Sequence, residues 1–171
     1  EALGQAFQAH KLDPRNDRPL RILIFLSEQN KQLELALEYV QKLIKIDPKK
    51  AEFFQMRGYF QLKLDQFEDA VESYQRAIRL DPNNPETYDK LATAWAAEDR
   101  LQEAIDLYRE AMEVNPDNAE IRNNFASILY RDEQTEAARE QLEAALEIDP
   151  NHPKALRNLA ILLITDEKLN D

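Results

Sequence analysis

The sequence predicts an all-α protein built from stacked pairs of helices, and three observations support this prediction. Prolines recur every 34 residues, at Pro14, Pro48, Pro82, Pro116 and Pro150. Alanines follow the same interval, at Ala36, Ala70, Ala104 and Ala138. A fixed period of this size is typical of stacked helical repeats. The chain also has only 2 glycines among 171 residues and is 32% charged and 43% hydrophobic, as expected for a soluble, mostly helical protein.

Each repeat is expected to hold two amphipathic helices, which we name A and B in chain order. Apolar residues recur at intervals of three and four residues, as in Leu91, Ala92 and Trp95, and this spacing places them on one helix face. The expected A helices are 19–30, 52–64, 86–98, 120–132 and 154–165. The expected B helices are 1–12, 34–46, 68–80, 102–114 and 136–148.

Prolines and capping residues predict the helix ends. Asp47-Pro48 and similar pairs end the B helices, because the residue before proline avoids the helical region and proline cannot continue the ladder of hydrogen bonds. Asn84 and His152, each followed by proline, are expected to begin A helices as N-caps. The periodic alanines are expected where A and B helices approach closely.

Net charge and composition exclude several classes of function. A net charge of −11 and a pI near 4.7 would repel nucleic-acid phosphates, so nucleic acid is not an expected partner. The apolar runs are too short to span a bilayer, so we expect no membrane insertion. Because the chain has no cysteine, its sequence is equally compatible with a soluble protein of the cytoplasm and with one of the periplasm.

The repeat pattern resembles that of tetratricopeptide repeats. The third repeat matches the family pattern at eight positions: Tyr88, Leu91, Ala92, Trp95, Ala104, Tyr108, Ala111 and Pro116. The resemblance implies an all-α, right-handed superhelical solenoid in a single array over residues 1–171. Residues 1–16 would end a preceding repeat, followed by full repeats at 17–50, 51–84, 85–118 and 119–152, and 153–171 would form the first helix of a further repeat.

Two departures from the family pattern give further expectations. Arg57 and Arg122 occupy positions that are normally apolar, where a buried guanidinium must either be paired or extend to water, and we favour extension to water. The usual glycine of the turn between helices A and B is replaced by Lys31, Asp65, Asp99 and Glu133. We therefore expect these turns to close with a different backbone geometry.

Catalysis has little support in the sequence. His10 and His152 lie in separate turns, and two isolated glycines cannot form a phosphate-binding loop. No set of nucleophile, base and oxyanion donors converges, so we predict that the chain is not an enzyme and holds no metal or cofactor. The main hypothesis is a non-enzymatic scaffold module for protein–protein interaction.

In the tetratricopeptide-repeat family, ligands bind in a concave groove lined by the A helices. The resemblance therefore implies groove positions here, which hold seven basic and five acidic residues and leave a charge of −13 for the rest of the chain. Phe25, Met56, Tyr59 and Leu62 are the expected apolar anchors for a peptide or protein segment. Expected polar contacts in the groove come from Arg21, Lys90, Asn124, Arg131, Arg157 and Asn158.

Two binding patterns of the family fit poorly, and two other functions remain open. The carboxylate clamp of chaperone-binding members is excluded because Asp89 would repel a carboxylate. The asparagine ladder of glycosyltransferase relatives is matched only at Asn124 and Asn158. The chain could instead form homo-oligomers through its terminal helices, or it could be the substrate-selecting arm of a larger enzyme.

Overall fold

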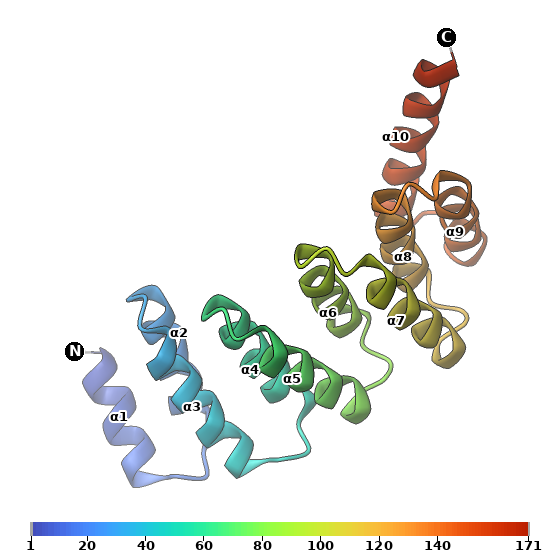
Figure 1. Cartoon of the computed structure of the whole chain (residues 1–171). Helices are drawn as coiled ribbons and strands as arrows, with labels where there is room; N and C mark the ends of the chain where they lie inside the picture. The colour runs from blue at the N-terminus through green and yellow to red at the C-terminus, as the bar shows by residue number, and fades with distance from the viewer. Residues whose placement is uncertain (1, 171) are drawn as a thin grey trace. The chain divides into compact units, whose positions relative to one another are not determined.

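The computed structural model describes the backbone of residues 2–170 and the side chains of residues 4–165, and it confirms the all-α prediction. Within this range there are ten helices and no strand (Figure 1). Their bounds are α1 Ala2–Leu12, α2 Asp17–Gln29, α3 Leu33–Ile46, α4 Ala51–Lys63, α5 Phe67–Leu80, α6 Pro85–Ala97, α7 Leu101–Val114, α8 Ala119–Arg131, α9 Thr135–Ile148 and α10 Pro153–Asn170. The predicted end positions 1 and 171 lie outside the described residues.

The observed helix bounds are close to the expected ones. Helices α1, α3, α5, α7 and α9 are the B helices, and each ends at the expected residue. The A helices α2, α4, α6 and α8 begin one or two residues earlier than expected and end one residue earlier. The largest difference is at α10, whose backbone stays helical to Asn170 instead of ending at 165.

Side chains next to the prolines fix the links between repeats. The Asn84 side chain accepts a hydrogen bond from the Glu86 amide at 3.0 Å, and His152 Nδ1 accepts one from the Ala155 amide at 3.2 Å. Both predicted N-caps are thus confirmed. Before the prolines, the side chain of Asp47 accepts from the Lys49 amide at 3.0 Å. Such a turn closed by an aspartate side chain explains why an acid precedes proline at the helix end.

The expectation of a different turn geometry was wrong. Lys31, Asp65, Asp99 and Glu133 all adopt a positive φ of 57 to 60°, which is the left-handed conformation that glycine would supply. At the first turn, Lys31 N donates to Glu28 O at 2.9 Å and Gln32 N to Ser27 O at 2.8 Å. This is the Schellman pattern of hydrogen bonds. It fixes the turn although a side chain in this conformation costs about 1–2 kcal/mol.

The chain divides into two compact units, residues 1–81 and 82–171, and each is described by itself. Unit 1 contains α1 to α5 around a core that includes Leu20, Leu23, Val40, Leu43 and Phe53. Unit 2 contains α6 to α10 and buries Ile105, Ile121 and Phe125 among others. The single array expected from the sequence stays a prediction.

Close packing of A against B explains the periodic small residues. Ala36, Ala70, Ala104 and Ala138 are fully buried, and the aromatic rings of Tyr74, Tyr108 and Trp95 are buried as well. In unit 1 a Cβ added to Gly58 would lie 2.9 Å from the Tyr74 ring. Glycine fits this position without strain, whereas a methyl group here would force the Tyr74 ring to shift.

The two unusual arginines do not simply extend to water, which corrects the expectation for them. Both are half-buried. Arg57 Nε donates to Ser73 Oγ at 2.7 Å, and its guanidinium lies 5.1 Å from the Phe54 ring centre. Arg122 donates to Pro116 O at 2.9 Å and to Gln141 Oε1 at 3.1 Å. Acceptors within the fold compensate the burial of each charge.

Candidate functional site

In unit 1 the four expected apolar anchors come from α2 and α4. Phe25 is 58% exposed on α2, whereas Met56, Tyr59 and Leu62 on α4 are half-buried. The Tyr59 hydroxyl donates to Glu28 Oε1 at 2.6 Å, and Lys63 Nζ donates to the same oxygen at 2.9 Å. These hydrogen bonds lower the pKa of Glu28, chiefly through Tyr59. The Tyr59 ring is thus held in one orientation.

Arg21 joins α2 to α4. Its guanidinium donates to both carboxylate oxygens of Glu52, at 2.5 and 2.8 Å, and its Nε donates to Asp17 at 3.0 Å. The hydrogen bond from Arg21 lowers the pKa of Glu52. A bidentate pair of this kind holds both side chains in a defined geometry. Arg21 therefore stabilises the stacking of successive A helices, and its role as a ligand contact stays a prediction.

In unit 2 the two expected asparagines belong to one network of three amides. Asn158 Nδ2 on α10 donates to Asn123 Oδ1 at 2.9 Å, and Asn123 Nδ2 donates to Asn124 Oδ1, also at 2.9 Å. Asn123 is only 2% exposed, so its amide needs these partners. The network connects α8 to α10 and orients the half-buried Asn158 and Asn124.

The expected cations of unit 2 differ in their surroundings. Lys90 forms an ion pair with Glu86, at 3.1 Å, on its own helix. Arg131 donates to Ala96 O at 3.0 Å, at the end of α6, and Arg157 is exposed on α10. Glu120 on α8 accepts from Lys154 Nζ at 2.6 Å and lies 3.0 Å from His152 Nε2. Burial alone would raise the pKa of Glu120, but these two partners outweigh it and the pKa is lowered.

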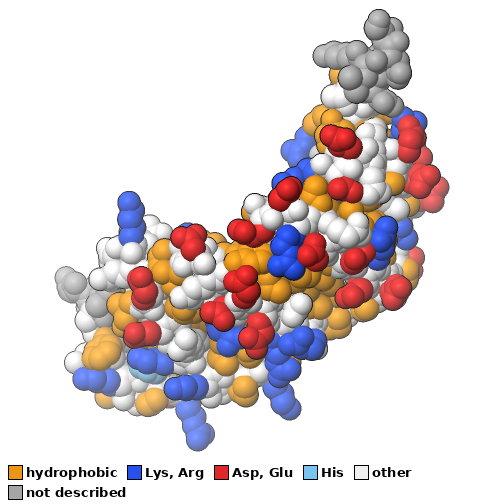
Figure 2. Space-filling view, viewed as in Figure 1, with side chains coloured by type: hydrophobic (Ala, Val, Ile, Leu, Met, Phe, Trp, Pro, Cys, Tyr) orange, Lys and Arg blue, Asp and Glu red, His pale blue; other side chains and the backbone are white. Residues whose placement is uncertain are grey.

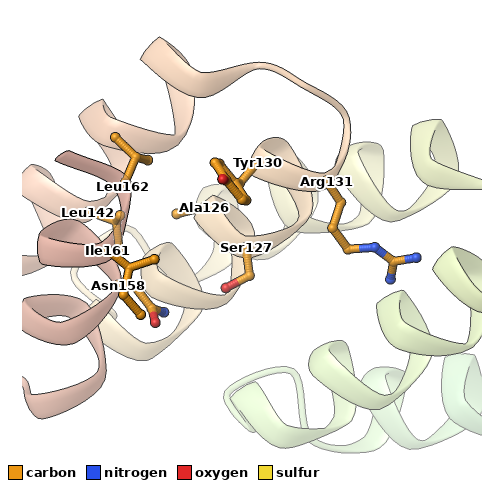
Figure 3. Close-up of a pocket in the computed structure, with 8 residues that line it drawn as sticks. All are labelled: Ala126, Ser127, Tyr130, Arg131, Leu142, Asn158, Ile161 and Leu162. Carbon is orange, nitrogen blue, oxygen red and sulfur yellow. The ribbon is translucent and has the colours of Figure 1, made fainter. Parts of the chain in front are cut away.

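A pocket of about 260 Å³ opens between α8 and α10, with α9 contributing to its wall. In Figure 3, Tyr130 and Ser127 approach from α8 and Ile161 and Asn158 from α10, while the Arg131 guanidinium points away from the pocket. The lining residues are Ala126, Ser127, Tyr130, Arg131, Leu142, Asn158, Ile161 and Leu162. Two of the ten expected site residues, Arg131 and Asn158, thus border a cavity.

The resemblance also implies groove positions for Tyr130 and Ile161, but they were not among the ten expected site residues. They are 45% and 51% exposed and lie on the side of the A helices where the groove was expected. The available signal was their size: large apolar residues at expected groove positions.

Acidic residues dominate the B helices of unit 2. Glu136, Glu140, Glu143 and Glu147 recur along one side of α9 at intervals of three and four residues and are exposed. Figure 2 shows red acidic side chains over α9. The A-helix side with the pocket therefore differs in charge from the B-helix side of the same unit.

Two other kinds of site, metal clusters and membrane-spanning helices, are considered for the described residues. Among the described side chains, no three potential metal ligands of the His, Cys, Asp and Glu types come together, and the absence of a metal stays a prediction. None of the helices within the described part of the chain combines the length and the apolar character needed to cross a membrane.

Comparisons with known proteins agree with the repeat pattern. Models described as tetratricopeptide repeat match residues 26–50 and 96–160, and a model described as TPR repeat matches residues 61–97. No curated protein sequence matches the chain significantly.

Several solved structures share the fold. YrrB, described as a TPR protein with an unusual peptide-binding site, is 22% identical, with 95% of this chain and 84% of that chain covered and a TM-score of 0.60. MamA is 21% identical, with 89% of each chain covered and a TM-score of 0.67. TTC0263, a thermophilic TPR protein of Thermus thermophilus, is 19% identical, with 95% and 89% covered and a TM-score of 0.68. From the repeat spacing, the helix pairs and these matches, we conclude that the chain belongs to the tetratricopeptide-repeat family.

Proposed function

We propose that the chain is a non-enzymatic interaction module that binds a peptide or protein segment on the exposed side of its A helices. The observation that supports this most is the exposure of large apolar side chains there. Ile22 and Phe25 are exposed on α2 in unit 1, and Tyr130, Ile161 and Ile164 are exposed in unit 2. Grouped apolar residues of this kind mark interaction sites on soluble proteins.

In unit 1 the proposed anchor is Phe25, with Met56, Tyr59 and Leu62 on the neighbouring A helix. The hydrogen bonds of Tyr59 and the ion pairs of Arg21 fix the side chains around it before any partner binds. A surface ordered in advance loses little conformational entropy on binding. Unit 1 therefore offers one exposed aromatic ring on an otherwise fixed surface.

A structural role for the polar side chains supports the non-enzymatic part of the proposal. Ser73 accepts a hydrogen bond from Arg57, and His152 caps α10. These groups, which could act as nucleophile or base elsewhere, stabilise the fold here. The resemblance to YrrB, described as having a peptide-binding site, also supports a peptide as partner at the level of the fold.

The test is the capture of partners from a lysate of the source organism on the immobilised chain and on its Phe25→Glu variant. We expect a protein that is retained by the chain and lost from the variant, because a carboxylate cannot replace the apolar ring. Phe7→Glu, which changes another exposed phenylalanine of unit 1 on the B helix α1, is the matched control. Equal capture by all three proteins would refute binding at Phe25.

A second candidate function is self-assembly, which the exposure of α10 favours. Leu156 and Leu163 are exposed, whereas the residues at the same repeat positions elsewhere include Leu20 and Leu129, which are buried. Light scattering should then show a mass that rises with concentration and a Leu163→Glu variant that stays monomeric. A constant monomer mass for the unmodified chain would exclude this candidate.

A further inference from the structure

We infer that the pocket between α8 and α10 receives one large aliphatic or aromatic side chain from an acidic peptide segment. This inference rests on the proposed function and names the class of partner for unit 2. It depends on three properties of the described residues: an apolar wall, a rigid frame, and two arginines, Arg131 and Arg157, on the helices that form the pocket.

The wall of the pocket is apolar. Ala126, Leu142 and Leu162 are buried in it, and Tyr130 and Ile161 face it from opposite helices with half of their surface exposed to water (Figure 3). Covering the two exposed side chains removes apolar area from water, which favours binding of an apolar ligand group. The volume of about 260 Å³ accommodates a single large side chain and not a folded element.

The frame of the pocket is fixed without a ligand. Asn158 is held by the buried Asn123, and the Arg131 guanidinium is held by the carbonyl of Ala96. Small-molecule and side-chain sites are usually preformed in this way. A ligand side chain can therefore enter without repacking of α8 against α10.

The charged residues around the pocket favour acidic residues next to that side chain in the ligand. Arg131 lies on the α6 side of the pocket, and the exposed Arg157 lies one helical turn before Ile161 on α10. The nearby Glu120 is already paired with Lys154 and His152. The exposed acids of α9, such as Glu143 and Glu147, would repel an acidic peptide from the B-helix side. An acidic segment is thus favoured beside the pocket and disfavoured along α9.

The test uses the ¹⁵N-labelled chain and three synthetic pentapeptides with blocked ends. One peptide has a central leucine between aspartates, the second replaces the leucine by alanine, and the third replaces the aspartates by lysines. We expect the first peptide to shift amide signals of α8 and α10 in a saturable way, with a Kd at least tenfold lower than for the other two. Equal affinities, or shifts confined to α7 and α9, would overturn the inference.

Matched variants locate the site. Ile161→Glu and Arg157→Glu should each weaken binding of the leucine peptide about tenfold, the first through the wall and the second through charge. Val114→Glu is the control, because Val114 is 53% exposed in the same unit, on the B helix α7, but does not line the pocket. Unchanged binding in both test variants, or an equal loss in the control, would contradict the pocket as the site.

This test can be separated from that of the proposed function. If Phe25→Glu loses a captured partner while the leucine peptide fails to bind, the interaction module stands and the pocket inference is overturned. If the peptide binds at α8 and α10 while capture is unaffected by Phe25→Glu, the pocket inference stands and the anchor in unit 1 is refuted.

Discussion

The two units have the same helical repeat but very different charge. Residues 1–81 contain 13 basic and 13 acidic residues, whereas residues 82–171 contain 9 basic and 20 acidic residues. The whole net charge of −11 thus belongs to unit 2. Because the packing positions are similar in both units, the difference shows that the surface of this fold changes charge independently of its core. A partner that recognises charge can therefore distinguish the two units.

The difference extends to the ends of the B helices. In unit 1, α3 and α5 have the cations Lys45 and Arg79 in their last turn, whereas α7 and α9 have no cation there. Glu113 and Glu147 occupy these last turns instead. The negative end of the helix dipole disfavours carboxylates, so unit 2 keeps its acidic surface at some cost in stability.

The units also differ in how they connect successive A helices. In unit 1 the connections are ion pairs, Arg21 with Glu52 and Lys63 with Glu28, at sequence separations of 31 and 35. Unit 2 also has such an ion pair, Lys154 with Glu120, and adds two contacts to uncharged acceptors: Asn158 donates to Asn123 and Arg131 donates to a carbonyl, both at a separation of 35. The repeat geometry brings these positions together in both units, and the residue types decide whether the contact depends on pH.

The largest expected effect concerns the packing of Gly58 against Tyr74 in the core of unit 1. Gly58→Ala should lower the free energy of unfolding by about 1–3 kcal/mol, because the added methyl group overlaps the Tyr74 ring. Urea denaturation followed by circular dichroism would measure this loss.

The control variant gives these two positions of unit 1 residue types that occur at the same repeat positions in unit 2. In unit 2 the same two repeat positions hold Ala126 with Leu142 on α8 and α9 and, one repeat earlier, Ala92 with Tyr108 on α6 and α7, and all four residues are buried. A Gly58→Ala/Tyr74→Leu variant should therefore be more stable than Gly58→Ala alone. If the double variant is the less stable of the two, size matching between these positions does not control the packing.

A smaller effect concerns the stability of the protein at acidic pH. Hydrogen bonding by Arg21 lowers the pKa of Glu52 in the folded state, so the pair stabilises above the unfolded pKa of about 4.3 and this contribution is lost as pH falls below it. Glu52→Gln should cost about 1 kcal/mol at pH 7 and reduce the loss of stability between pH 5 and 3. Thermal denaturation across this pH range provides the measurement.

Asp89 in unit 2 should contribute a pH dependence of stability with the opposite sign. Burial raises the pKa of Asp89, so protonation as pH falls favours the folded state. In an Asp89→Asn variant, stability should therefore decrease more steeply with acid than in the unmodified chain. If the stability of the Glu52→Gln and Asp89→Asn variants changes with pH in parallel with that of the unmodified chain, folding shifts the pKa of neither carboxyl group.

The smallest effect concerns the helix ends. Glu113→Lys and Glu147→Lys should each raise the free energy of unfolding by about 0.5 kcal/mol, and Lys45→Glu and Arg79→Glu should lower it by a similar amount. Chemical denaturation at low and high salt tests both directions, because screening should reduce each change. An equal effect at both salt concentrations would point to packing instead of charge.

Most of the fold could be predicted from the sequence because the signal repeats. The 34-residue interval of Pro48 and Pro82 and the alanines such as Ala70 defined helix ends and close contacts several times over. The α10 helix was predicted too short because its end was placed by analogy with the other A helices, whereas its backbone stays helical to Asn170. The turn at Lys31 was misjudged because the flanking helices, and not the turn residue, impose its conformation.

The site was less predictable for a physical reason. Repeat positions indicated that Arg21 and Asn158 lie on the A-helix side, but not which side chain each would bind. Those partners lie about one repeat away and depend on how neighbouring helices stack. The pocket depends in addition on the sizes of Tyr130 and Ile161, which no single repeat position specifies.

The four left-handed turns have a practical consequence. Lys31, Asp65, Asp99 and Glu133 are all exposed and share nearly the same φ, and the sequence contains no cysteine. A single cysteine introduced at any of them would place a spectroscopic label on the same type of backbone, away from the core. The protein thus has four equivalent attachment points, two in each unit, at regular intervals along the chain.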